Sequence, residues 1–207
     1  MRIRFASLVV LSFYLVGCGG LLSGGSANLV HSSGLPSADD AFASDAVAGQ
    51  ANGQLIAESF PVLNQDQIRS VRWWGRSENN FFTDLQNMET FTVRLYSSSG
   101  GLPGTILAEK TVSVADSLPS AIGTASNGST VYRHRVNFDA PVSIPSGTYW
   151  ISIGATTTDR NGDGWYWSTT QTNADNTFAA QIPVGNAFQT SGFDDLCFEV
   201  ERSVISP

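Results

Sequence analysis

Cysteine, histidine and lysine are scarce in this chain of 207 residues, which holds two cysteines, two histidines and one lysine. Two cysteines cannot build a disulfide framework. If Cys18 is modified, as argued below, only Cys197, His31 and His134 remain, which are too few for a cysteine–histidine zinc site. The longest apolar run, Phe5 to Val16, has 12 residues, whereas a membrane-spanning helix needs roughly 20. Stability must therefore come from a hydrophobic core.

Positive charge is also scarce. The chain has 11 basic and 18 acidic residues, a net charge of −7. If residues 1–17 are removed, Arg2 and Arg4 go with them, and 9 basic residues face 18 acidic ones for a net charge of −9. Nucleic-acid binding relies on a cationic surface, so no nucleic-acid partner is expected.

The N-terminus has the pattern of an export signal. Arg2 and Arg4 precede the apolar run, which ends in Leu15-Val16-Gly17-Cys18. This ending resembles the bacterial lipobox, in which a small residue precedes an acylated cysteine. We therefore expect a signal peptide over residues 1–17 and a lipid, palmitate included, on Cys18. The lipid would anchor the chain stably to the cell envelope. Gly19 in place of aspartate favours the outer membrane, by resemblance to Gram-negative sorting rules.

The segment after Cys18 predicts a spacer. Residues 19–50 are rich in glycine, serine, alanine and aspartate, which is typical of a flexible linker. An irregular first strand is an alternative only near residues 40–50. We therefore expect residues 18–50 to be the lipidated cysteine and its tether, and residues 51–207 to be a single domain.

Alternating apolar residues in short runs predict strands throughout that domain. In the clearest run, Phe91, Val93 and Leu95 point one way and Thr92, Arg94 and Tyr96 the other. Similar runs end or begin at glycine, proline, asparagine and aspartate, and no segment after residue 50 has a helical period. The prediction is an all-β antiparallel sandwich, jelly-roll-like. Other predicted strand segments are 106–114, 132–138, 149–153, 165–168 and 196–201.

Five segments together carry a family resemblance: Ile68–Gly75, Phe91–Tyr96 with Gly100–Gly104, Gly147–Ile153, Trp165–Trp167 and Leu196–Val200. Their content and order resemble the β-sandwich module of exported bacterial proteins with varied anchors, including PEP-CTERM-type sorting tails. The resemblance covers roughly residues 53–201. It implies the fold but no catalytic motif. The chain departs from the sorting-tail members because its expected anchor is N-terminal, with no C-terminal hydrophobic segment.

One loop has the spacing of a calcium site. Asp159, Asn161 and Asp163 place three oxygen side chains at alternate positions, and the carbonyl of Trp165 could add a fourth ligand. Asp194 and Asp195 could complete the site, and calcium would then be structural. The alternative is a plain hairpin turn, for which the sequence Asn-Gly-Asp-Gly is sufficient.

Aromatic residues suggest a second site. Trp73 and Trp74 are adjacent, so one should face the core and the other the exterior or a rim. Exposed rings beside polar groups can stack on sugars, which makes Trp74, Tyr166, Arg72 and Arg76 candidate ligand-binding residues. The alternative is ordinary core packing.

No pattern in the sequence predicts catalysis. His134, on the strand face of Val136, is expected to be structural and partly buried, and Cys197 to be buried. No known nucleophile or zinc-hydrolase motif is present. The expected function is a non-enzymatic binding or display module for a glycan or a protein. The alternatives are a calcium-stabilised structural or adhesive module and a carbohydrate-active enzyme.

Overall fold

The structure, a computed structural model, describes residues 28–44, 54–77, 88–157, 165–171, 178–182, 184–191 and 194–203. These residues form strands in two sheets and one 3₁₀ turn, η3 (Ala115–Ser117). All strand pairings are antiparallel, which confirms the predicted all-β sandwich and its single domain. None of the described segments is a helix long and apolar enough to cross a membrane.

The first sheet has seven strands and is built around β4 (Asp66–Ser77). One edge of β4 pairs with β8 (Thr130–Ile144), which pairs in turn with β7 (Ser120–Thr124). The other edge is shared end to end by two strands. They are β13 (Phe198–Arg202) and β10 (Trp165–Thr170), with β1 (Leu29–Ser32) beyond β13 and β2 (Pro36–Ala43) beyond β10.

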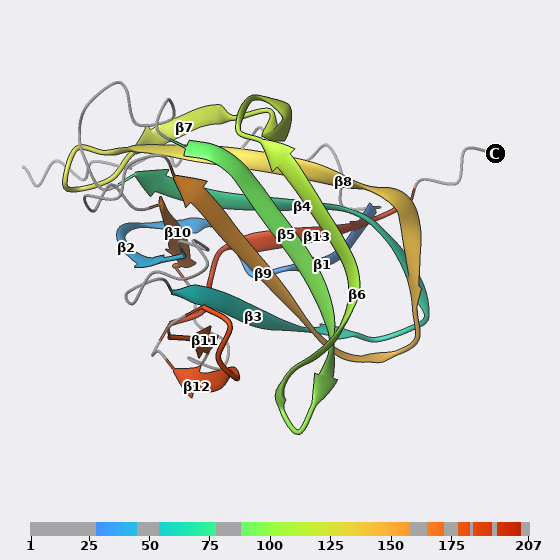
Figure 1. The fold of residues 1–207 in the computed structure, drawn as a ribbon. Helices are drawn as coiled ribbons and strands as arrows, with labels where there is room; N and C mark the ends of the chain where they lie inside the picture. The colour runs from blue at the N-terminus through green and yellow to red at the C-terminus, as the bar shows by residue number, and fades with distance from the viewer. Residues whose placement is uncertain are drawn as a thin grey trace, which may run out of the picture.

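The second sheet has six strands. Its order is β12 (Gln189–Ser191), β11 (Phe178–Gln181), β3 (Leu55–Val62), β9 (Gly147–Thr157), β5 (Met88–Ser99) and β6 (Leu102–Ser113). The β5–β6 hairpin extends beyond the body of the sandwich, and β11 and β12 lie together at the far edge of the sheet (Figure 1).

The core lies between the sheets and follows the predicted alternation. Phe91, Val93 and Leu95 are fully buried, and so are Trp73, Trp165 and Trp167 from the first sheet. Phe91 contacts Trp73 and Trp165 edge to face, with ring centroids 5.3 and 5.2 Å apart. Such aromatic contacts add to the free energy gained by burying apolar area.

The expected tether is wrong for residues 28–44. Leu29 of β1 lies opposite Glu201 of β13, and Phe42 of β2 lies opposite Trp167 of β10. Val30 and Phe42 pack against the core, and this apolar contact outweighs the Gly- and Ser-rich composition that predicted a linker. The domain therefore begins well before residue 51, whereas Cys18 lies outside the described residues.

Candidate functional site

The residues predicted to bind sugar come together on the outer face of the first sheet, but they do not form an open platform. Arg72, Trp74 and Arg76 alternate along β4, and Tyr166 of β10 lies directly opposite Arg76. The expectation of an exposed Trp74 ring is wrong, because this residue is only 7 % exposed. It packs in a small cluster with Val131 and other residues of neighbouring segments.

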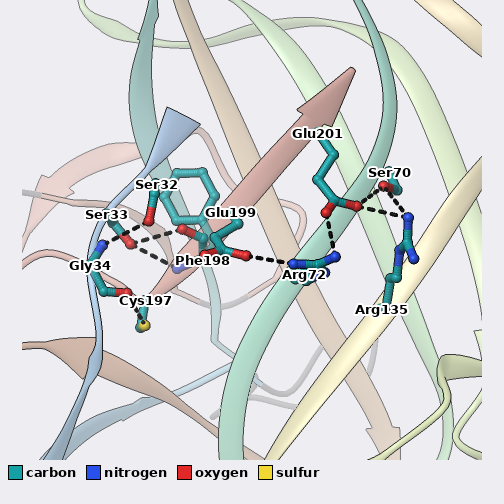
Figure 2. Close-up of polar contacts among 10 residues, drawn as sticks. All are labelled: Ser32, Ser33, Gly34, Ser70, Arg72, Arg135, Cys197, Phe198, Glu199 and Glu201. Atoms are coloured by element: carbon teal, nitrogen blue, oxygen red, sulfur yellow. Dashed lines mark hydrogen bonds and ion pairs between the residues drawn. The ribbon is translucent and has the colours of Figure 1, made fainter. Parts of the chain in front are cut away.

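Arg72 belongs to a network of ion pairs that joins three strands (Figure 2). Its guanidinium lies 3.1 Å from Glu199 and 2.5 Å from Glu201. Glu201 also bridges to Arg135 at 2.8 Å and accepts a hydrogen bond from the Ser70 hydroxyl at 2.5 Å. Arg72 and Arg135 are cross-strand neighbours, so the carboxylate offsets the repulsion of two like charges. This arrangement holds the sheet together and leaves Arg72 committed to protein partners.

Cys197 lies at the base of the same region, under the connection between β1 and β2 (Figure 2). Its thiol donates to the carbonyl of Gly34 at 3.3 Å. Ser33 makes two hydrogen bonds with the backbone of Phe198, the residue after Cys197. Its hydroxyl donates to the Phe198 carbonyl and accepts from the Phe198 N–H. Burial, assisted by the charge of Glu199, raises the pKa of the Cys197 thiol far above its ordinary value. The thiol is therefore neutral and unreactive, as expected of a buried cysteine.

The predicted calcium ligands Asp159, Asn161 and Asp163 lie outside the described residues. The ring of Trp165 is fully buried, and its carbonyl accepts a hydrogen bond from the Ser44 N–H at 3.0 Å. Within the described part of the chain, no group of three His, Cys, Asp or Glu residues is placed to hold a metal ion. Calcium binding at this loop stays a prediction.

His134 is a core residue, which confirms its predicted structural role. Its ring stacks on Trp73 with centroids 5.3 Å apart and an interplanar angle of 17°. Nδ1 lies 2.9 Å from the hydroxyl of Ser117, which itself donates to the carbonyl of Val114, so Nδ1 carries the proton. Burial lowers the pKa of His134 to about 3 and keeps the ring neutral.

A cavity lies instead on the outer face of the second sheet, on a side that the sequence did not single out. We call it the outer groove; its volume is about 550 Å³. One wall is the β5–β6 hairpin, the other is the segment that joins β11 to β12, and the floor comes from β5. The lining residues are Arg94, Tyr96, Ser99, Leu102, Pro103, Gly104, Ile106, Gln181, Ala187 and Phe188.

Packing beneath the outer groove fixes its aromatic floor. Tyr96 clusters with Trp150 on the outer face of the sheet, and its ring meets Phe188 edge to face with centroids 5.7 Å apart. The Tyr96 hydroxyl is 3.1 Å from the Ser152 hydroxyl. Burial raises the pKa of Tyr96, and hydrogen bonds with Ser152 and Arg94 offset part of that rise, so the phenol stays neutral. The aromatic part of the floor is therefore well packed and uncharged.

An ion pair lies beside this floor. Arg94 of β5 lies opposite Glu109 of β6, and its Nε–H donates to the Glu109 carboxylate. Burial disfavours the charged guanidinium, but Glu109 and Tyr96 outweigh this effect and raise the pKa of Arg94. The lining of the outer groove thus contains one charged group, Arg94, and Glu109 neutralises it from β6, just outside the lining.

One signal in the sequence could have located the outer groove. Arg94 and Tyr96 alternate with the apolar Phe91, Val93 and Leu95, so the sequence places a tyrosine on the non-core side of this strand. In the structure Tyr96 is only 5 % exposed, so other residues must cover it. The cover includes Phe188, which is nearly a hundred residues away along the chain and has no local pattern that links it to Tyr96. Gln181 is missed for the same reason.

Two antiparallel sheets packed face to face, with a groove on the outer face of one of them, define a β-sandwich domain. A family model described as "Domain of unknown function (DUF7901)" matches residues 31–201, and the chain belongs to this family. The match begins within β1, in agreement with the place of β1 and β2 in the fold. No curated protein matches the chain.

Proposed function

We propose that this chain is a lipid-anchored, non-enzymatic binding module of the bacterial cell envelope, and that its ligand binds in the outer groove. The observation that carries the proposal is the outer groove itself. Its volume of about 550 Å³ lies within the range of about 300–1,000 Å³ typical of small-molecule sites. Its lining combines aromatic and aliphatic surface with a few hydrogen-bonding groups, which is the usual composition of such sites.

The first sheet supports a binding site less well. Trp74 is buried, and Arg72 is held by Glu199 and Glu201. A ligand there would have to displace ion pairs that stabilise the sheet, and breaking such pairs costs free energy. The outer groove needs no such rearrangement.

The expected lipid would keep the domain near the membrane. Asn28, where the described domain begins, comes ten positions after Cys18, so the two residues lie at most about 35 Å apart. A tether of this length suits a module that binds or displays a ligand close to the envelope surface.

Binding by the mature lipidated chain in detergent micelles tests the proposal. The probes are an array of neutral and acidic oligosaccharides and an array of short peptides. The groove variant is the pair Gln181→Ala and Phe188→Ala, which removes contacts from one wall and leaves the sheets intact. The matched control is Ile122→Ala on β7, an apolar residue that is 44 % exposed on the other sheet.

We expect the parent chain and the control to bind at least one probe, and the groove variant to lose that binding. Binding that survives in the groove variant, or no binding to any probe, would show that the outer groove is not a ligand site. Circular dichroism and the melting temperature of each variant establish that the fold is retained.

A further inference from the structure

Resting on the proposed function of the outer groove, we propose that its ligand is a neutral glycan, with two adjacent hydroxyls of one sugar bound to the Arg94–Glu109 pair. The charge, the hydrogen-bonding groups and the apolar surface of the outer groove each support this choice.

The outer groove has no net charge to offer a ligand. Arg94 is the one charged residue among those that line it, and its Nε–H donates to the carboxylate of Glu109. A polyanion would gain little from a guanidinium that is already neutralised and would be repelled by Glu109. It would also approach a mature chain of net charge −9. A polycation would gain equally little from the Glu109 carboxylate, because Arg94 already neutralises it.

The ion pair matches the chemistry of a vicinal diol. A sugar hydroxyl both donates and accepts, whereas a guanidinium only donates and a carboxylate only accepts. Two neighbouring hydroxyls can therefore accept from Arg94 and donate to Glu109, and both bonds are charge-assisted. The side chain of Glu109 is 45 % exposed and that of Arg94 is 27 % exposed, so both groups are accessible to a ligand.

The remaining lining suits the other surfaces of a sugar. Phe188 and Ile106, the latter 49 % exposed, present apolar surface to the C–H face of a sugar ring. Gln181 is fixed by a hydrogen bond from the Gly185 N–H to its Oε1, and its NH₂ group supplies two further donors.

An apolar peptide would use only part of this surface. Its apolar side chains would cover the Arg94–Glu109 pair without hydrogen-bonding to its remaining polar atoms, and such desolvation without new hydrogen bonds is costly. The polar lining therefore favours a glycan over an apolar peptide as the occupant.

Oligosaccharide binding by the mature lipidated chain and its Glu109→Gln variant tests this choice of ligand. The probes are neutral glucan, mannan and galactan oligomers and an acidic series of oligogalacturonate and oligoalginate. The control is Asp139→Asn, which removes another exposed ion-pair carboxylate, the partner of Lys110. A peptide array is included, and neutral binding is repeated at high salt.

The expected result is binding of the neutral series, with a Kd that salt changes by less than about twofold. The Glu109→Gln variant should bind the neutral series about tenfold more weakly, because one charge-assisted bond is lost. It should gain affinity for the acidic series, because Arg94 is no longer neutralised. The Asp139→Asn control should leave the affinities for the neutral and the acidic series unchanged.

Binding of acidic oligomers or peptides by the parent chain, lost in the groove variant, would overturn the neutral glycan and leave the proposed function standing. Neutral binding that Glu109→Gln leaves unaltered would overturn the role of the ion pair. No groove-dependent binding of any probe would overturn both proposals.

Discussion

Trp165 occupies the space that a side chain on Gly75 would need. A Cβ built on Gly75 would lie 2.3 Å from Cζ2 of the Trp165 ring, far inside van der Waals contact. Gly75 lies opposite Trp167 in the β4–β10 pairing, and both tryptophans are fully buried. Glycine at this position thus lets the indole ring pack directly on the β4 backbone.

Gly75→Ala should therefore destabilise the domain by about 1–3 kcal/mol, the usual cost of overpacking a core. The control is Gly123→Ala on β7, where an added Cβ meets nothing within 4 Å. Urea unfolding followed by tryptophan fluorescence gives both free energies of unfolding. Equal stabilities for the two variants would contradict the close packing of Trp165 on Gly75.

Glu201 should be the key residue of the ion-pair network on the first sheet. Its side chain is only 8 % exposed, and Glu201→Gln would weaken its contacts with Arg72, Arg135 and Ser70. We expect a loss of about 2–3 kcal/mol, between the values for exposed and buried ion pairs. Asp139→Asn, at a carboxylate that is 82 % exposed, should change stability by less than about 0.5 kcal/mol. A loss for Glu201→Gln no larger than for this control would show that the network is not stabilising.

Acid should destabilise the domain through its two histidines, of which His134 is fully buried and His31 is partly buried. Burial lowers the pKa of His134 from 6.5 to about 3 and that of His31 to about 4. Between these values and 6.5 the unfolded chain binds more protons than the folded one, so stability falls as the pH falls. Each histidine should contribute a slope of about 1.4 kcal/mol per pH unit in this window.

His134→Gln tests this linkage, because it removes one titrating group. Free energies of unfolding measured at pH 7 and pH 5 should differ less in the variant than in the parent chain, whatever the stability of the variant at pH 7. An identical pH dependence would mean that folding does not lower the pKa of His134.

Alternation along the strands was sufficient to predict the core. A period of two residues places Phe91 and Val93 on one face of their strand, and His134 and Val136 on one face of theirs. These are the faces that the sandwich buries. The sandwich could thus be predicted from local patterns alone. The role of residues 28–44 could not, since β1 and β2 gain their stability by pairing with strands more than a hundred residues away.

The candidate site depended on contacts of the same long-range kind. Trp74 was expected at the exterior, and it does face away from the core. Its burial depends on Val131 and Cys197, which come from separate parts of the chain. The outer groove likewise needs the β5–β6 hairpin and the segment with Phe188 to meet across one face of a sheet. A local pattern reports which face a side chain is on, but not what covers that face.

The Cys197 thiol should be unreactive in the folded chain. Burial raises its pKa, and it donates to Gly34, so little thiolate forms at neutral pH. If Cys18 carries the proposed lipid, a thiol reagent such as DTNB should modify one cysteine per chain, and only after guanidinium is added. Rapid modification of the folded protein would contradict the burial of Cys197.

A lipid on Cys18 underlies the proposed role at the envelope, and intact mass spectrometry of the chain purified from bacterial membranes tests it most directly. The mature chain should begin at Cys18 and carry the added mass of a diacylglyceryl group and an amide-linked acyl chain. A Cys18→Ser variant should carry neither and should leave the membrane fraction on processing, or remain unprocessed. A membrane-extracted chain that begins at another residue, or that begins at Cys18 without lipid, would contradict the lipid anchor.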